Sequence, residues 1–220
     1  METICPKEMC TGCTACMNVC PHRAINMQPD TCGFTYPVIN QDMCVDCGLC
    51  TKTCPVNNPL ELENIKNCYA VTVKEEEELL SCSSGGAATA FSLYVIKQGG
   101  VVYGCSGTNP RHVRHIRVDS SDDIENLKGS KYVQSDLGDA FAQIRADLKS
   151  NPLVLFIGTP CQVAGLKNFL HKDCPNLITI DLVCHGVPSQ KMLNDNLNYY
   201  CPEDEDVKVC FRRKNLKLKP

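Results

Sequence analysis

Two segments of the chain repeat one cysteine pattern, C-x-x-C-x-x-C-x-x-x-C-P, at a constant offset of 34 residues. The repeated cysteines are Cys10, Cys13, Cys16 and Cys20 in the first segment and Cys44, Cys47, Cys50 and Cys54 in the second. Thiolates at this spacing are typical ligands of iron–sulfur clusters. The pattern therefore predicts two 4Fe-4S clusters in one small module, and it constrains the N-terminal part of the chain more than any other feature.

The spacing also indicates which cysteines share a cluster, as in two-cluster bacterial ferredoxins. Three closely spaced thiolates converge from one loop, whereas the fourth is carried away by a further turn and reaches the other cluster. The predicted ligand sets are Cys10, Cys13, Cys16 and Cys54 for one cluster and Cys44, Cys47, Cys50 and Cys20 for the other. Pro21 and Pro55 end any helix directly after the two exchanged ligands. Gly12, Ala15 and Gly48 let backbone N–H groups approach the sulfurs, which influences reduction potential.

Three other uses of paired cysteines fit the pattern less well. A zinc site needs two C-x-x-C pairs separated by a longer loop, and a third cysteine three residues further on would crowd a single ion. A disulfide framework is typical of secreted chains, and the N-terminus lacks the charged and apolar regions of a signal peptide. A thioredoxin-like motif needs a single C-x-x-C rather than a doubled run.

Composition narrows the classes of partner. The chain has 220 residues, 43% of them hydrophobic, which suits a small module followed by one ordinary domain with a core. A net charge of −3 gives no reason to expect nucleic acid binding, and we interpret the basic residues 211–220 as a solvated tail. No apolar run is long enough for a transmembrane helix. The 18 cysteines, without an export signal, predict a reducing cytoplasmic location.

We expect an α+β ferredoxin-type module over residues 1–62, with repeats at 1–30 and 35–62, followed by an α/β domain over residues 67–220. Residues 33–40 alternate in polarity and are expected to form a small hairpin that encloses the clusters. Beyond the module, apolar runs alternate with amphipathic runs, which predicts a mainly parallel sheet covered on both faces. The predicted strands cover residues 68–73, 101–105, 115–118, 153–157, 177–184 and 207–211, and the predicted helices cover residues 86–97, 136–149, 161–170 and 189–200.

Three junctions of the α/β domain carry residue types suited to a cofactor. A glycine-rich turn before a helix, in which Ser84 is the predicted N-cap, suits a phosphate group and consists of Ser83, Ser84, Gly85 and Gly86. A loop with a cation, an aromatic ring and hydrogen-bonding groups suits a flavin and contains Ser130, Lys131, Tyr132 and Gln134. Well-capped loops would explain both without a ligand. Cys161 and Cys184 follow consecutive strands, at the sheet edge where open α/β folds bind ligands. Cys161 with His185 also fits a cysteine hydrolase, but the upstream clusters would then have no purpose.

Four motifs together resemble one known family. The motifs SSGGAATAF, GSKYVQSD, VLFIGTPCQVAGLKNFL and DLVCHGVPS resemble, in this order, the coenzyme F-420 hydrogenase/dehydrogenase beta-subunit family. The resemblance extends from Cys10 to Lys214, and members with a fused two-cluster ferredoxin are common among anaerobes. It implies that the domain after residue 66 binds FAD. It also implies a third 4Fe-4S cluster near the flavin, with Cys161 and Cys184 among its ligands.

The sequence departs from the family at its C-terminal end. Relatives continue well beyond the element Phe211–Lys214, whereas this sequence stops at Pro220 and contains no Trp. We therefore expect an incomplete C-terminal part, in which Cys161 and Cys184 cannot complete a four-cysteine site.

The resemblance implies an iron–sulfur flavoprotein oxidoreductase. Such a protein passes electrons between 4Fe-4S clusters, FAD and a two-electron substrate such as a deazaflavin coenzyme, because a flavin exchanges either one or two electrons. Ser84–Gly86 would hold phosphate and Lys131 would stabilise the reduced flavin. The alternative is a ferredoxin-type electron-transfer protein whose α/β extension is a docking platform without flavin, and a further alternative is a non-functional remnant. In the first two cases a redox partner protein or subunit is expected.

Overall fold

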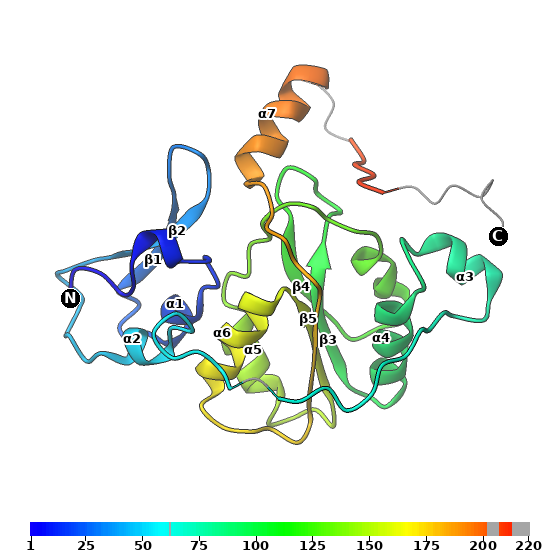
Figure 1. The fold of residues 1–220 in the computed structure, drawn as a ribbon, viewed down its shortest axis with the longest axis horizontal. Helices are drawn as coiled ribbons and strands as arrows, with labels where there is room; N and C mark the ends of the chain where they lie inside the picture. The colour runs from blue at the N-terminus through cyan, green and yellow to red at the C-terminus, as the bar shows by residue number, and fades with distance from the viewer. Residues whose placement is uncertain (62, 202–206, 213–220) are drawn as a thin grey trace.

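The structure is a computed structural model that describes residues 1–61, 63–201 and 207–212. Figure 1 shows a small N-terminal module beside a larger α/β domain. The module contains η1 (Lys7–Met9), α1 (Ala15–Val19), β1 (Ile25–Pro29), β2 (Thr35–Ile39) and α2 (Leu49–Thr53). The domain contains α3 (Glu76–Ser81), α4 (Ala87–Lys97), β3 (Val101–Ser106), β4 (Arg114–Val118), η2 (Asp122–Leu127), α5 (Ala140–Asp147), β5 (Val154–Gly158), α6 (Pro160–Leu170), β6 (Leu177–Asp181) and α7 (Gln190–Tyr200). Among the described residues, no helix is long and apolar enough to cross a bilayer.

The backbone of the module repeats with the cysteine pattern. Gly12 and Asp46, at the 34-residue offset, both have positive φ, at 67° and 53°. Thr14 and Gly48, at the same offset, are the left-handed residues directly before α1 and α2. Residues that adopt positive φ reverse the chain sharply. Each repeat therefore coils its three closely spaced cysteines in the same way before a short helix begins.

The prediction of a hairpin within residues 33–40 is wrong in its bounds. This segment supplies one strand, β2, which pairs antiparallel with β1 in the register Ile25↔Ile39. The turn between them is closed by Asp30, whose Oδ1 accepts hydrogen bonds from the N–H groups of Cys32 and Phe34. Because Asp side chains favour such turns, the reversal occurs before residue 35 rather than inside the alternating segment.

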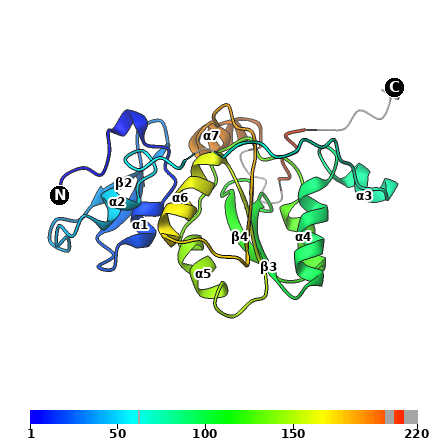
Figure 2. The same ribbon diagram turned by 60° about the horizontal axis from the view of Figure 1, so that its bottom comes forward.

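The sheet of the α/β domain has the strand order β4-β3-β5-β6 and is mainly parallel. β3 and β6 both pair parallel with β5, and β4 pairs antiparallel at the edge. Alternate residues face opposite layers, as strand geometry requires. Val101, Tyr103, Val154 and Phe156 pack toward α5 and α6, whereas Val102, Leu155 and Ile157 pack with Val95 of α4. Figure 2 shows α5 and α6 on one side of the sheet and α4 on the other, which confirms the predicted covering of both faces.

Some predicted elements differ from the structure. Residues 68–73 and 207–211 lie within the described ranges and form no strand, and β6 ends at Asp181 rather than at residue 184. Tyr69 and Val71 are exposed, so the first of these segments has residues with strand propensity but no neighbouring strand. α5 begins at Ala140 instead of residue 136, because Asp136–Asp139 form a turn in which Asp136 accepts from the Gly138 N–H.

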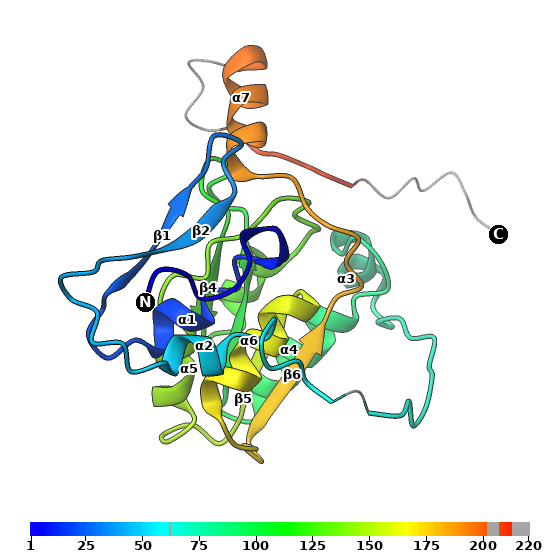
Figure 3. The same cartoon turned by 60° about the vertical axis from the view of Figure 1, so that its left-hand side comes forward.

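The module packs onto the α5–α6 layer, so that the layers follow each other as module, helices, sheet and α4. α1 contacts both α5 and α6, and α2 contacts α6. Asn18 of α1 donates to the carbonyl of Gly138 at 2.9 Å and accepts from the N–H of Ala142 at 3.2 Å. Asn168 of α6 donates to the carbonyl of Asn58 at 2.7 Å. In Figure 3 the module lies in front of these helices, with the β1–β2 hairpin beside the start of α7.

A buried hydrogen-bond network holds the first turn of α6 against β4. The His115 ring stacks on Phe156, and its Nε2 lies 3.0 Å from the carbonyl oxygen of Ile157. Since a carbonyl only accepts, Nε2 carries the proton and Nδ1 accepts from the Ser135 hydroxyl at 3.1 Å. Gln162 donates to the same hydroxyl oxygen at 3.0 Å. Burial lowers the pKa of His115 to about 4, so the ring is neutral.

The stability of the α/β domain is expected to fall as the pH decreases from 6.5 to 4. The folded pKa of His115 lies below its ordinary value, so the unfolded chain binds the proton first and gains from it. The contribution of neutral His115 to the free energy of unfolding is present in full above pH 6.5, and about 3 kcal/mol of it is lost by pH 4. Denaturant unfolding of the wild type and of His115→Gln across this pH range measures the loss. The variant should lose part of the pH dependence, and an unchanged slope would contradict the assignment.

Candidate functional site

Two hollows open on the N-terminal module, and each is lined by one of the predicted ligand sets. The first, here named the inner hollow, is lined by Cys5, Cys10, Cys13, Cys16 and Cys54 together with Ile4, Met27, Pro37 and Val56. The second, the outer hollow, is lined by Cys20, Cys44, Cys47 and Cys50 together with Ala24, Ile25, Ile39 and Leu49. The structure thus brings Cys54 to the first cysteine run and Cys20 to the second.

The donor chemistry of both hollows fits a 4Fe-4S cluster. All 18 cysteines are free thiols. Within the described ranges, no three His, Cys, Asp or Glu side chains converge closely enough to hold a single metal ion. A cluster does not need that convergence, because each of its cysteine ligands binds a different iron atom. Four thiols around an apolar hollow are therefore suited to a cluster rather than to one zinc ion.

Burial favours the protonated thiols in the inner hollow. It raises the pKa of Cys13 to about 11. It also raises the pKa of Cys16, and the neighbouring thiols Cys13 and Cys10 raise that pKa further. Iron binds the deprotonated sulfur, so loading this hollow releases protons and is favoured at higher pH.

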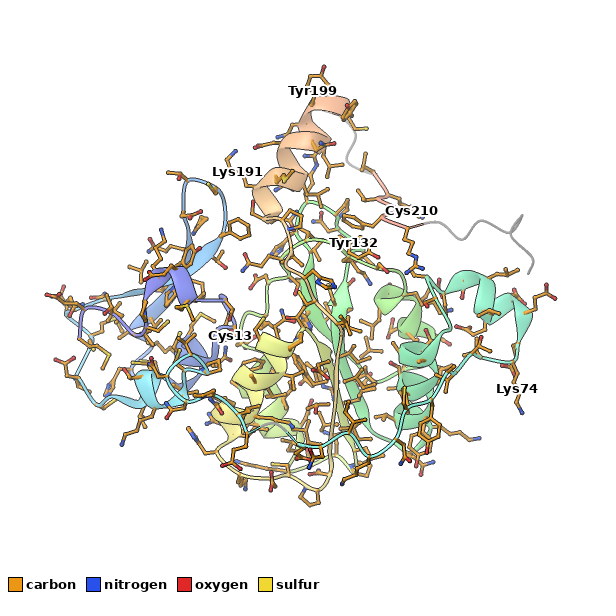
Figure 4. The ribbon with its side chains drawn as sticks, viewed as in Figure 1. Cys13, Lys74, Tyr132, Lys191, Tyr199 and Cys210 are labelled. Atoms are coloured by element: carbon orange, nitrogen blue, oxygen red, sulfur yellow. The ribbon has the colours of Figure 1, made fainter. Side chains whose placement is uncertain are left out.

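The inner hollow lies directly against the α/β domain. Cys13 belongs to the same buried cluster as Phe141 and Leu166, and Figure 4 labels it on the side of the module nearest α6. A Cβ atom on Gly165 of α6 would lie only 3.1 Å from Cys13 Sγ and 3.3 Å from the ring of Phe141. Gly165 therefore lets the Cys13 loop approach the backbone of α6.

Cys161 and Cys184, the predicted ligands of an incomplete third site, follow β5 and β6 as expected. Cys161 lies in the first turn of α6, where its Sγ is 3.1 Å from the Thr159 hydroxyl. It is near enough to Cys13 to contribute to the raised pKa of that thiol. Cys184 is exposed in the loop after β6, and its Sγ accepts from the Gly186 N–H at 3.3 Å. Only Cys161 is thereby placed next to the inner hollow.

The predicted phosphate turn is shaped by chain packing. The N-cap of α4 is Gly86, with φ 81°, and not Ser84 as expected. A Cβ atom at Gly86 would lie 2.9 Å from the Val73 side chain, and one at Gly85 would lie 2.4 Å from the Val71 carbonyl oxygen. Contact with the preceding segment thus explains both glycines, and they do not indicate a cofactor.

The predicted flavin residues are only partly brought together. Ser83 accepts a hydrogen bond from the Ser130 N–H at 2.9 Å, so these two loops are adjacent. Lys131 points inward, where Nζ donates to the carbonyls of Leu127 and Lys128 at 2.7 and 2.9 Å, and burial lowers its pKa.

Tyr132 and Gln134 lie apart from this pair of loops. The half-exposed Tyr132 ring lies edge-on to Phe211. Gln134 accepts from the Thr35 N–H at 3.4 Å and so faces the N-terminal module. The described side chains of Lys131, Tyr132 and Gln134 face different parts of the molecule and do not form one cradle that fits a flavin.

Sequence reasoning missed Cys5, which lines the inner hollow but stands outside both repeats. Cys5, Cys10 and Cys13 have the spacing C-x-x-x-x-C-x-x-C, which occurs in plant-type ferredoxins, and this is the signal in the sequence that could have marked Cys5.

Two family models match separate segments of the chain. The family model for a 4Fe-4S dicluster domain matches residues 9–58, and the model for the C terminus of the coenzyme F420 hydrogenase/dehydrogenase beta subunit matches residues 152–217. No curated protein matches the sequence. A solved structure titled "Xenon derivatization of the F420-reducing [NiFe] hydrogenase complex from Methanosarcina barkeri" is similar over 64% of this chain, at 20% identity and a TM-score of 0.48. The similarity covers 53% of that chain, so this protein spans about half of its length. The chain is thus similar to 4Fe-4S dicluster domains over residues 9–58 and to the C terminus of the coenzyme F420 hydrogenase/dehydrogenase beta subunit over residues 152–217.

Proposed function

We propose that this protein conducts single electrons between an external redox partner and a partner subunit that docks on its α/β domain. Residues 1–62 form the conducting module and residues 67–220 form the docking domain. The proposed ligands are Cys10, Cys13, Cys16 and Cys54 in the inner hollow and Cys44, Cys47, Cys50 and Cys20 in the outer hollow. A bound 4Fe-4S cluster supplies a carrier for one electron in each hollow.

The position of Cys13 is the observation that carries the proposal. Of the proposed ligands, Cys13 is packed in the core shared by α5, α6 and the sheet. The close approach at Gly165 leaves no side chain between the Cys13 loop and the α6 backbone. Electron transfer weakens steeply with distance, so this contact favours the inner hollow as the exit toward the α/β domain.

The outer hollow is suited to receive electrons from outside. Cys47 is exposed, and Cys44 is partly exposed. Its buried ligand Cys50 packs with Cys16 and Cys54 in a separate cluster within the module. These contacts favour a path from the partner through the outer hollow and then the inner hollow.

The α/β domain has two candidate roles beyond this path. The family resemblance favours an FAD that would collect electrons for a two-electron substrate. The inward Lys131, the turn filled by Val71 and Val73, and Gln134, which faces the N-terminal module, favour a docking platform for a partner subunit instead. The geometry supports the platform better, and we propose it for this chain.

Anaerobic reconstitution of the full chain with iron, sulfide and FAD tests the proposal. We expect about eight iron and about eight sulfide per chain, no retained flavin, and uptake of about two electrons in a reductive titration. Retention of one FAD with about four electrons per chain would replace the platform by the flavin interpretation. Iron without the spectrum of a 4Fe-4S cluster would overturn both.

A further inference from the structure

A fifth thiol lies in the inner hollow beside the four proposed ligands. Cys5 is the only residue of its segment 1–6 to place a thiol there, and it lines the hollow together with Cys10 and Cys54. The two hollows therefore differ in the number of thiols that line them.

The segment that carries Cys5 is held on both sides. Ile4 is buried, and its carbonyl oxygen accepts from Asn57 Nδ2 at 2.8 Å. Asn57 follows Cys54 closely and also donates to the carbonyl of Thr51, which ties the Cys5 segment to the end of α2. Further toward the N-terminus, Gln41 donates to the carbonyl of Met1 at 2.8 Å. Cys5 is thus kept in the hollow by backbone contacts.

The neighbours of Cys5 show which edge of the hollow it occupies. Cys5 packs against the buried cluster that contains Ile4 and Cys54, and the Ile4 carbonyl is bonded to Asn57, three residues after Cys54. Cys5 therefore lies on the edge of the hollow that Cys54 occupies, the proposed ligand from the second cysteine run.

The described lining of the outer hollow contains no such extra thiol. At the 34-residue offset from Cys5 the chain has Ile39, which lines the outer hollow with an aliphatic side chain. The counterpart of Cys54 there is Cys20, which has only the three ligands of its own set beside it in this lining. This difference within one chain allows an internal comparison.

We propose that Cys5 is a reserve ligand of the inner 4Fe-4S cluster and replaces Cys54 when that thiolate is missing. The inference rests on the proposed function, because it requires a cluster in the inner hollow. In the replacement, a bond forms between Cys5 Sγ and the iron left open, the thiol proton passes to solvent, and any water on that iron leaves. No electron is gained or lost in this exchange.

Matched variants of the full chain, reconstituted anaerobically, test the inference by iron and sulfide content and by electron paramagnetic resonance. Cys54→Ala is expected to keep about eight iron per chain, because Cys5 supplies the fourth ligand. Cys20→Ala, its counterpart, is expected to fall to about half, as is the double variant Cys5→Ala/Cys54→Ala. Cys5→Ala alone and Cys32→Ala, an exposed cysteine outside both hollows, should keep the full content.

Equal iron loss in Cys54→Ala and in the double variant would overturn the reserve-ligand role. A wild-type chain that binds no cluster would instead overturn the proposed function, so the two failures are distinguishable. Far-ultraviolet circular dichroism monitors folding. Cys54→Ser with and without Cys5→Ala repeats the comparison with a side chain of similar size, should the alanine variant not fold.

Discussion

Replacing Cys50 with alanine is expected to lower the iron content of the reconstituted chain by about half and to leave a cluster that a protein donor reduces slowly. Cys50 is the buried ligand of the outer hollow, and no fifth thiol is among the described residues that line that hollow. The remaining cluster would lie in the inner hollow, whose Cys13 packs against α6, and we expect a protein-sized donor to reach it less readily than the outer hollow with its exposed Cys47. Stopped-flow reduction by a reduced bacterial ferredoxin, followed by the loss of visible absorbance, measures the effect.

Cys16→Ala is the matched control, since Cys16 occupies the equivalent position of the first run. The hydrogen bond from Asn57 to the Ile4 carbonyl holds Cys5 at the end of α2 beside Cys54, so we expect no rescue of Cys16→Ala. This variant should also lose about half of its iron, but its remaining outer cluster should still be reduced rapidly by the ferredoxin. Dithionite, a small reductant, should reduce both variants. Equal rates with the ferredoxin would contradict the order of the two clusters along the path.

The repeated cysteine spacing predicted which thiols would lie together because the constraint is local and periodic. Each run coils through the same two positive-φ positions, as at Gly12 and Asp46, and the chain between the runs then returns as one hairpin. The apolar runs of β3 and β5 likewise predicted a sheet covered on both faces, because only buried parallel strands are apolar throughout. In both cases the spacing or polarity of neighbouring residues determines the local backbone geometry, so the sequence predicts it without tertiary information.

The flavin residues could not be predicted in the same way, because side-chain direction there depends on tertiary contacts. Lys131 follows η2, and the carbonyl groups at the end of that element take up its ammonium group. Gln134 faces Thr35, which is distant in the sequence. The glycines of the α4 turn are required by the irregular segment at Val71, which had the propensity of a strand. The motifs thus indicated a resemblance, which the match over residues 152–217 supports, but did not indicate the directions of the side chains.

Phe141→Ala is expected to destabilise the α/β domain by about 3 to 5 kcal/mol, which corresponds to a decrease in melting temperature of about 6 to 20 °C. The Phe141 side chain is fully buried, and its ring packs against Phe156 and Phe169 with centroids 5.8 and 6.0 Å away. Alanine would leave a cavity below Gly165, the residue on which the Cys13 loop rests. Thermal unfolding of the full chain, followed by circular dichroism, measures the change.

Phe91→Ala is the matched control, because this ring on α4 is half exposed and should cost no more than about 0.5 kcal/mol. The two variants also separate packing from electron transfer. If the packing of the Cys13 loop on α6 depends on Phe141, the Phe141→Ala variant should release iron at a lower temperature than Phe91→Ala. The inner cluster should then be lost before the outer one. Unfolding of the domain without earlier loss of that cluster would mean that the module holds the inner cluster independently. The contact at Gly165 would then contribute to electron transfer from the inner cluster but not to the stability of that cluster.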